Sequence, residues 1–121
     1  MHRLAPHSLL ALLFASLVPA AATAENIDLL MSNLFPKEEL TYIGFDSVER
    51  ADIPTASGVD RKYLIVDFRS GYGRDREQEL ASVHRVCTAL LKNRDLIRSL
   101  THQGYDMVSV AFDRHYQYDC L

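Results

Sequence analysis

The stretch KYLIVDFRSGYGRDREQELASVHRVCTALLK, residues 62–92, decides the fold. It begins with a run of aromatic and β-branched residues, 62–69, which predicts a strand. After a turn with two glycines, Asp75 is a candidate N-cap with Gln78 three residues later, and this weak capping-box pattern predicts a helix over the rest of the stretch. Alternating apolar residues over 105–113 predict a second strand. This order of strand, helix and strand favours two parallel strands joined by a right-handed crossover.

Segments on the N-terminal side add a helix and another strand. Apolar residues at helical spacing predict a helix over 27–35, which Pro36 limits. The segment TYIGFDSV, residues 41–48, is rich in aromatic and β-branched residues and predicts a strand. A turn-rich connection follows it over 49–60, and it is longer than a tight hairpin requires.

The central helix carries the main packing surface. Residues 93–104 either continue this helix or restart it after Asn93, with Gly104 as the stop. The expected apolar stripe of the central helix consists of Leu80, Val83, Cys87, Leu90 and Leu91. We therefore expect an α/β or α+β fold in which helices cover a small, three-stranded sheet with a strand-helix-strand unit.

The N-terminal segment has the pattern of an export signal. Residues 1–24 contain Arg3, then an apolar run over 9–18, and they end in a small-x-small motif. This predicts a secretory signal peptide cleaved after Ala24. An uncleaved membrane anchor is the alternative, but the apolar run is short for a bilayer span. The mature chain, residues 25–121, is expected to be a single small exported domain with no stable membrane anchor.

Export gives the two cysteines a structural interpretation. Cys87 and Cys120 are the complete set in the chain. In an oxidising compartment they predict one disulfide, which would hold the C-terminal tail against the domain. A redox pair or a metal site is the alternative, but a C-x-x-C spacing and a larger thiolate cluster are both missing.

The charge distribution is uneven. The expected mature chain, which lacks Arg3, has 12 basic and 16 acidic residues, so its formal charge is −4. Acidic residues dominate 25–60 and basic residues dominate 61–98. The acidic balance disfavours a nucleic-acid partner. The asymmetry indicates either two complementary faces or a local basic patch for an anionic partner.

A parallel crossover would bring two loops to one edge of the sheet. These loops are RSGYGRD, 69–75, and DRHYQYD, 113–119. Glycines and a helix N-terminus in the first loop favour an anion. The spacing is neither a P-loop nor a dinucleotide fingerprint, so an ordinary strand-to-helix turn is the alternative. The candidate ligand- or partner-binding residues are Arg69, Tyr72, Arg74, Arg114, His115 and Tyr116.

Catalytic signals are weak. His115 follows Asp113 closely, and such a pair could act as a general base. However, no nucleophile elbow, zinc-protease motif or reactive cysteine setting accompanies them. His84 and His102 are too scattered for a zinc site. We therefore expect no catalytic residues, no metal and no cofactor, and a small periplasmic hydrolase that uses Asp113 and His115 is the alternative function.

Several segments together resemble a known family. They are the export signal, LIVDFR, HRVCTALL, GYDMVSVAFD and the ending YQYDCL. The chain resembles a family of small secreted pseudomonad proteins described as quorum-sensing-regulated virulence factors. The resemblance implies an exported α/β protein of undefined molecular activity, and it carries no catalytic residues. We expect a periplasmic or extracellular binding protein, associated with virulence, whose partner is a protein or a small anionic ligand.

Overall fold

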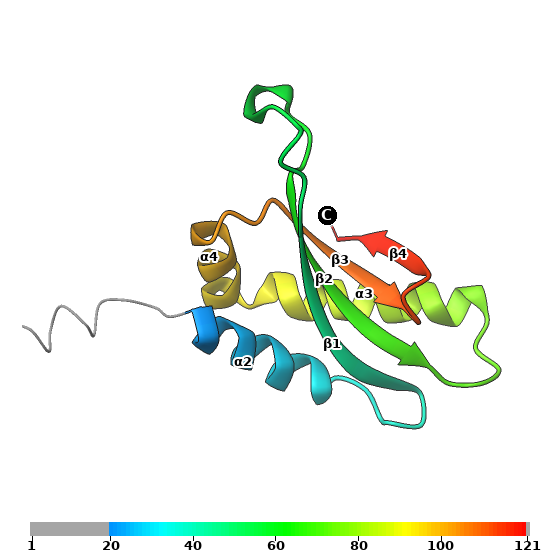
Figure 1. The fold of residues 1–121 in the computed structure, drawn as a ribbon. Coiled ribbons are helices and arrows are strands. Elements are labelled where there is room, and N and C mark those ends of the chain that lie inside the picture. The colour runs from blue at the N-terminus through cyan, green and yellow to red at the C-terminus, as the bar shows by residue number, and fades with distance from the viewer. Residues whose placement is uncertain (1–19, 121) are drawn as a thin grey trace, which may run out of the picture.

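The computed structural model describes residues 20–120, whose architecture is α+β (Figure 1). Three α-helices accompany a four-stranded sheet within these residues. The elements in chain order are α2 (Ala20–Ser32), β1 (Leu40–Glu49), the short 3-10 helix η1 (Thr55–Ser57), β2 (Lys62–Ser70), α3 (Arg76–Lys92), α4 (Arg94–His102), β3 (Met107–Phe112) and β4 (Tyr116–Asp119).

The sheet is mixed and its strands follow the order of the chain. The order is β1-β2-β3-β4. β1 pairs antiparallel with β2, β2 pairs parallel with β3, and β3 pairs antiparallel with β4. The two helices α3 and α4 form the connection between the parallel strands. The predicted strand-helix-strand unit and its parallel pairing are therefore confirmed.

The prediction of three strands was wrong, because the tail forms β4. The turn before β4 places Asp113 and Arg114 at φ 52° and 59°, and the backbone N–H of His115 donates to the carbonyl of Phe112 at 3.1 Å. Tight turns with left-handed residues usually have the sequence Asn-Gly or Asp-Gly. Asp-Arg lacks that signal, and the strand has only four residues. The additional strand leaves the fold class unchanged.

One face of the sheet packs against all three helices. Its buried residues on β2 are Leu64, Val66 and Phe68, and β3 adds Val110 and Phe112. The helices contribute Ile27, Met31, Val86, Leu90, Leu96 and Leu100 to the same core. Burial of each such side chain contributes roughly 1.5–3 kcal/mol. The helices thus form a single layer on a two-layer domain.

The apolar stripe of α3 agrees in part with the predicted one, because Leu90 is buried and Val83 and Cys87 pack against the core. Its buried residues are Ser82, Val86 and Leu90, whereas Leu80 and Leu91 are exposed. At 3.6 residues per turn, Leu80 and Leu91 lie roughly 120–140° around the helix from Val86. The counted apolar residues spanned too wide an arc for all of them to face the sheet.

The helix boundaries agree with the capping signals where these exist. The Asp75 carboxylate accepts from the backbone N–H of Gln78, and the Gln78 side chain accepts from the N–H of Asp75, so the capping box is complete. The Asn93 side chain accepts from the N–H of Leu96, which confirms the restart as α4. The first helix differs: α2 begins earlier than expected, at Ala20, and ends at Ser32. Residues 1–19 of the predicted signal peptide lie outside the described residues.

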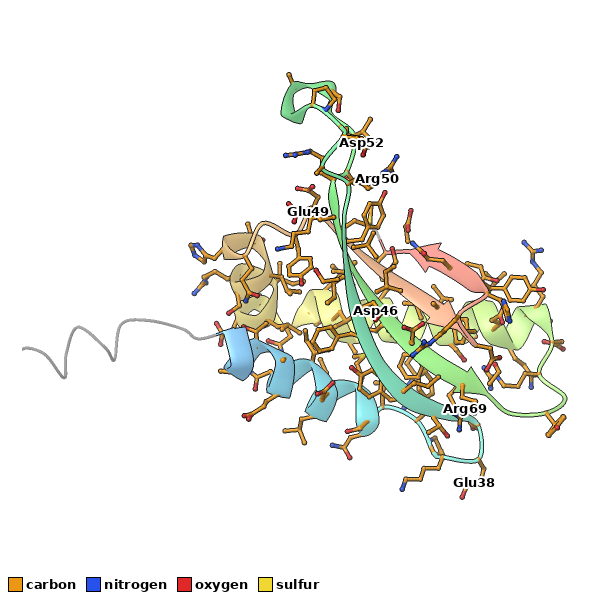
Figure 2. The ribbon with its side chains drawn as sticks, in the orientation of Figure 1. Glu38, Asp46, Glu49, Arg50, Asp52 and Arg69 are labelled. Carbon is orange, nitrogen blue, oxygen red and sulfur yellow. A yellow bond between two sulfur atoms is a disulfide. The ribbon has the colours of Figure 1, made fainter. Side chains whose placement is uncertain are left out.

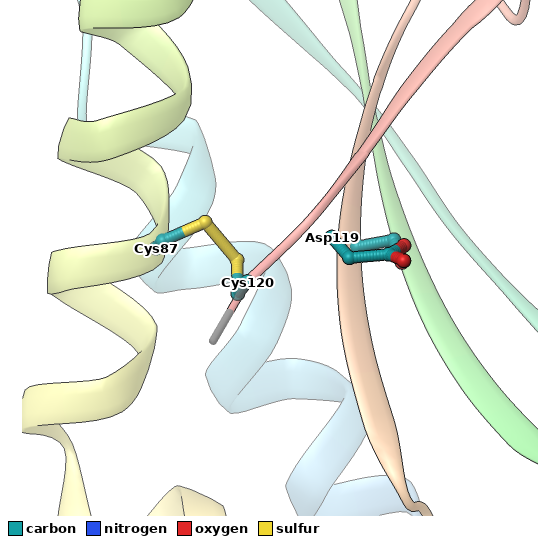
Figure 3. Close-up of a disulfide and its surroundings, with 4 residues drawn as sticks. Cys87, Asp119 and Cys120 are labelled. Atoms are coloured by element: carbon teal, nitrogen blue, oxygen red, sulfur yellow. A yellow bond between two sulfur atoms is a disulfide. The ribbon is translucent and has the colours of Figure 1, made fainter. Parts of the chain in front are cut away.

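The predicted disulfide between Cys87 and Cys120 is confirmed (Figure 3). It joins α3 to the end of β4, and the two Cα atoms are 5.4 Å apart. The N–H of Cys120 also donates to the carbonyl of Val108 at 2.8 Å. The C-terminal strand is therefore fixed to the sheet on one side and to the helix layer on the other.

Beyond the sheet, the β1–β2 connection projects as an arm (Figure 1). At its base, the N–H of Arg50 donates to the carbonyl of Arg61 at 2.7 Å. The Asp106 carboxylate accepts from the N–H groups of Arg61 and Lys62 at 2.7 and 3.1 Å. These hydrogen bonds hold the pKa of Asp106 below its usual range. The arm is thus anchored at its base to the segment that enters β3.

The disulfide is the feature that bears on the compartment. A disulfide of this kind is typical of oxidising compartments. Within residues 20–120, no helix has the length and the apolar content that a membrane crossing requires.

We predict that replacing both cysteines by serine destabilises the domain by about 2–4 kcal/mol, because the cross-link closes a long loop. Urea unfolding measures this change. Hydrogen exchange should become faster in β4 and at residue 120 first, since the sheet hydrogen bonds alone then hold the tail. Reduced wild-type protein is the matched control and should behave like the variant. Equal stability of the oxidised wild type and the variant would contradict the prediction.

Candidate functional site

The carboxyl ends of β2 and β3 lie together, as the parallel crossover predicts. The N–H of Asp113 donates to the carbonyl of Phe68 at 2.8 Å. In return, the Asp113 carboxylate accepts from the N–H of Ser70 at 3.2 Å. The loop after β2 and the turn after β3 are therefore joined by two hydrogen bonds. We call this end of the sheet, with residues 69–75 and 113–116, the loop edge.

A close backbone approach fixes the start of the loop edge. The N–H of Gly71 donates to the carbonyl of Glu39 at 3.1 Å. A Cβ atom at Gly71 would lie 2.8 Å from the carbonyl oxygen of Glu38, which is closer than such contacts allow. Glycine is therefore required here because the segment before β1 runs directly against the loop.

Tyr72 and Arg74 lie beside a cleft on the helix side of the loop edge. This cleft has a volume of about 430 Å³, and its lining includes Phe35, Glu38, Glu39 and Arg85. The Arg74 guanidinium donates to the carbonyl of Gln78 at 3.0 Å and to the hydroxyl of Ser82. Arg74 is thus part of the packing at the start of α3 as well as of the cleft wall.

Arg85 is a cleft residue that the sequence analysis missed. Its guanidinium lies over the Phe35 ring, 5.1 Å from the ring centroid. This places a second cation beside Arg74, while Glu38 and Glu39 supply two acidic side chains. Arg74 precedes α3 and reaches along the helix to Ser82, three residues before Arg85, so helical spacing from Arg74 gave no signal for this pair.

The other four predicted residues lie elsewhere at the loop edge. Arg69 ends β2 on the side of the sheet without helices, and Arg114 and His115 form the exposed turn after β3. Tyr116 begins β4 and is 64% exposed, and Tyr72 is fully exposed. The six predicted residues therefore share one end of the sheet but divide between its two sides.

Asp113 and His115 have separate hydrogen-bond partners in the structure. The Asp113 carboxylate is engaged by the Ser70 N–H, and the backbone of His115 closes the turn onto Phe112. Tyr118, three residues after His115, donates its hydroxyl to Glu79 at 2.5 Å, and this contact raises the pKa of Tyr118. These interactions hold the turn and the tail in place, and none of them orients an imidazole for proton transfer.

A carboxyl pair on the sheet is a feature that the sequence analysis did not identify. Asp67 is only 3% exposed although it points to the side without helices. Its neighbours in register are Gly44 on β1 and Ala111 on β3, and these small residues leave room for the carboxyl group. A side-chain hydrogen bond joins Asp67 to Asp46. The usable signal was a single acidic residue within the apolar run of β2.

Burial and the proximity of Asp46 raise the pKa of Asp67, and Arg114 opposes this shift. Because the folded state holds the proton more tightly than the unfolded chain, this group stabilises the fold at low pH. That contribution is lost as the pH rises through the raised pKa.

We predict that Asp67→Asn is more stable than the wild type at neutral pH, because the amide keeps a hydrogen bond to Asp46 without a buried charge. The advantage should shrink as the pH falls toward about 4, where an ordinary aspartate becomes protonated. Thermal unfolding across this pH range measures it. The exposed Asp52→Asn is the control and should follow the wild-type curve. Parallel curves for Asp67→Asn and the wild type would contradict the prediction.

A second hollow, larger than the cleft beside Tyr72, lies away from the loop edge. It has a volume of about 810 Å³, between α2 and α4, and its apolar lining includes Leu29, Leu30, Leu34 and Leu96. Charged residues are sparse there, since Asp95 and Arg98 alone contribute them. This groove shares no residue with the predicted site.

Within residues 20–120, no group of three or more histidine, cysteine or acidic side chains is arranged to hold a metal ion.

The comparisons with known proteins give no match: no family model fits the chain, and neither a curated protein nor a solved structure is significantly similar to it. The assignment of a function therefore depends on the geometry of the chain itself.

Proposed function

We propose that this chain is a small exported binding protein that recognises its partner with the loop edge, in the periplasm or outside the cell. The main observation in support of this proposal is that Tyr72 and Tyr116 are both exposed at the same end of the sheet. Tyrosine and arginine are the residue types most enriched at energetically important interface positions. Two exposed tyrosine rings accompanied by Arg69 and Arg114 have this composition.

The rigidity of the loop edge supports a binding role. Gly71 is fixed against residues 38–39, Asp113 is bonded to Ser70, and the disulfide holds the following strand. A preorganised surface loses little conformational entropy when a partner binds. The exposed rings therefore extend from a backbone that needs little further ordering.

The cleft beside Tyr72 suits an acidic group of the partner. Arg74 and Arg85 line it, and a guanidinium pairs well with a carboxylate or a phosphate. Glu38 and Glu39 lie in the same wall, so a ligand with an acidic group and a neighbouring donor fits better than a bare anion. This supports an acidic protein segment as the partner more than a free inorganic ion.

A hydrolase that uses Asp113 and His115 is less well supported, because the Asp113 carboxylate is occupied by the Ser70 N–H. The association with virulence rests on the resemblance to the secreted pseudomonad family alone, and it enters the proposal on that basis.

We predict that a photo-crosslinking amino acid at position 72 or 116 captures one and the same partner in the cells that export the protein. The matched control is position 59, because Val59 is also an exposed apolar residue but lies on the arm, at the opposite end of β2. Capture should weaken as the salt concentration rises, since arginine contacts contribute. Mass spectrometry identifies the captured chain.

The double substitution Tyr72→Ala/Tyr116→Ala should reduce binding of that partner at least about tenfold, as expected for two interface anchors. Its melting temperature should remain close to that of the wild type because both rings are exposed. Identical capture from positions 59, 72 and 116, or unchanged affinity of the double variant, would contradict a site at the loop edge.

We also predict that the exported protein begins at Glu25. In the structure, α2 continues through this point, and the buried Thr23 hydroxyl accepts from the Gln103 side chain at 3.0 Å. Cleavage would shorten α2 and remove this one contact. Ala24→Tyr should block processing because the last residue before the cut must be small, whereas Thr23→Val should not. N-terminal sequencing measures the outcome, and exported wild-type protein that still carries Met1 would refute it.

A further inference from the structure

The side of the sheet opposite the helices has an apolar composition that the contacts described above do not explain. Residues 63–68 of β2, YLIVDF, and β3, MVSVAF, each have five apolar residues among six. Parallel strand pairs with such continuous apolar runs are normally covered on both faces. Here the three helices cover only one face. We call the other side the open face; its residues are Thr41, Ile43, Gly44, Asp46, Val48, Tyr63, Ile65, Asp67, Arg69, Met107, Ser109, Ala111, Gln117 and Asp119.

Apolar side chains on the open face remain partly exposed. Ile43 is 39% and Val48 is 41% exposed, although both lie within the long strand β1. Ile65 on β2 is half-buried between them and β3. The centre of the face, at Asp67, Ser109 and Ala111, is already buried by its neighbours. The open face therefore has a closed centre and an apolar margin that a covering surface would bury.

The charged residues of the open face are Asp46, Asp67, Asp119 and Arg69, and Asp119 accepts a hydrogen bond from the Ser109 hydroxyl. Asp46 lies in register with Ile65, whereas Arg69 lies four residues further along β2. At about 3.3 Å per residue these two levels are roughly 13 Å apart. Two copies with their open faces together can be related by a two-fold axis that runs between the faces, perpendicular to the strands, at the level of Asp67. The strands of one copy would then run opposite to those of the other. Arg69 of one copy would then lie over Asp46 of the other, and the second pair would form symmetrically.

We propose that two copies of this chain associate through their open faces, with Arg69 of each copy against Asp46 of the other. A partner of purely basic or purely acidic character fits less well, because the face carries both charges at defined levels. Figure 2 shows Arg69 at the end of the sheet and Asp46 further along β1.

A dimer formed by pairing of edge strands is less favourable than one formed through the open faces. At the β1 edge, the register shifts between Tyr42 and Gly44, and the strand carries Asp46 and Glu49. Bulges and charges of this kind oppose edge-to-edge association. β4 offers only four residues at the other edge.

The expected dimer is weak. Four strands at about 4.8 Å spacing and six residues at about 3.3 Å give a face of roughly 400 Å². Because the centre of each face is already buried, two such faces would remove at most roughly 800 Å² from solvent, which is below the range of stable complexes. The association should therefore depend on concentration and on salt.

Analytical ultracentrifugation of the mature, oxidised protein tests the proposal. The wild type should shift from one to two chains per particle as its concentration rises. Asp46→Arg and Arg69→Asp should each raise the dimer dissociation constant at least about tenfold, because each places like charges across the interface. An equimolar mixture of these two variants should restore dimers, since both contacts again join opposite charges.

Leu80→Lys is the matched control, because Leu80 is an exposed apolar residue on α3, on the helix side. It should dimerise like the wild type, and circular dichroism should confirm that every variant is folded. A wild type that remains monomeric at the highest concentration would overturn the proposal. Dimers that persist in both charge variants, or a mixture of them that stays monomeric, would overturn it as well.

Discussion

The parallel contact between β2 and β3 is the constraint on which the other features of the domain depend. Two parallel neighbours need a long crossover, and α3 with α4 provides it. This crossover places the helix layer on one side of the sheet and sends the loops after both strands to one end. It also leaves β3 with a free edge, which the chain covers by turning back as β4. The position of the loop edge, the helix layer and the open face all follow from this one pairing.

The crossover does not hold the C-terminal strand β4 in place, and the disulfide provides this attachment. β4 is too short to be held firmly by its hydrogen bonds to β3 alone. Cys87 lies on the flank of α3, beside the buried line of Ser82, Val86 and Leu90, where the tail passes. The cross-link therefore joins the last strand to the helix layer and closes the domain around its small core. A domain with one helix layer has few other means to keep its C-terminus in place.

Much of the fold could be predicted from the sequence because the strongest signals were local. The capping box at Asp75, the second cap at Asn93 and the apolar strands are short-range patterns, and each formed where the sequence indicated. β4 was missed because its turn uses two left-handed residues, Asp113 and Arg114, without a glycine. The stripe of α3 was predicted only in part, with Leu80 and Leu91 wrongly included, because the rotation of the helix against the sheet decides which apolar residues are buried. Helical spacing leaves that rotation undetermined.

The candidate site was less predictable, because its residues divide according to the side of the sheet they face. The sequence brought Arg69 and Arg74 to one end, and the structure separates them: Arg74 packs onto α3, and Arg69 faces the open side. Asp67 could be recognised only by its register with Gly44 and Ala111, since these two small residues create the space for its carboxyl group. A buried acid with a raised pKa weakens a small domain at neutral pH, and substitution by asparagine would remove that cost.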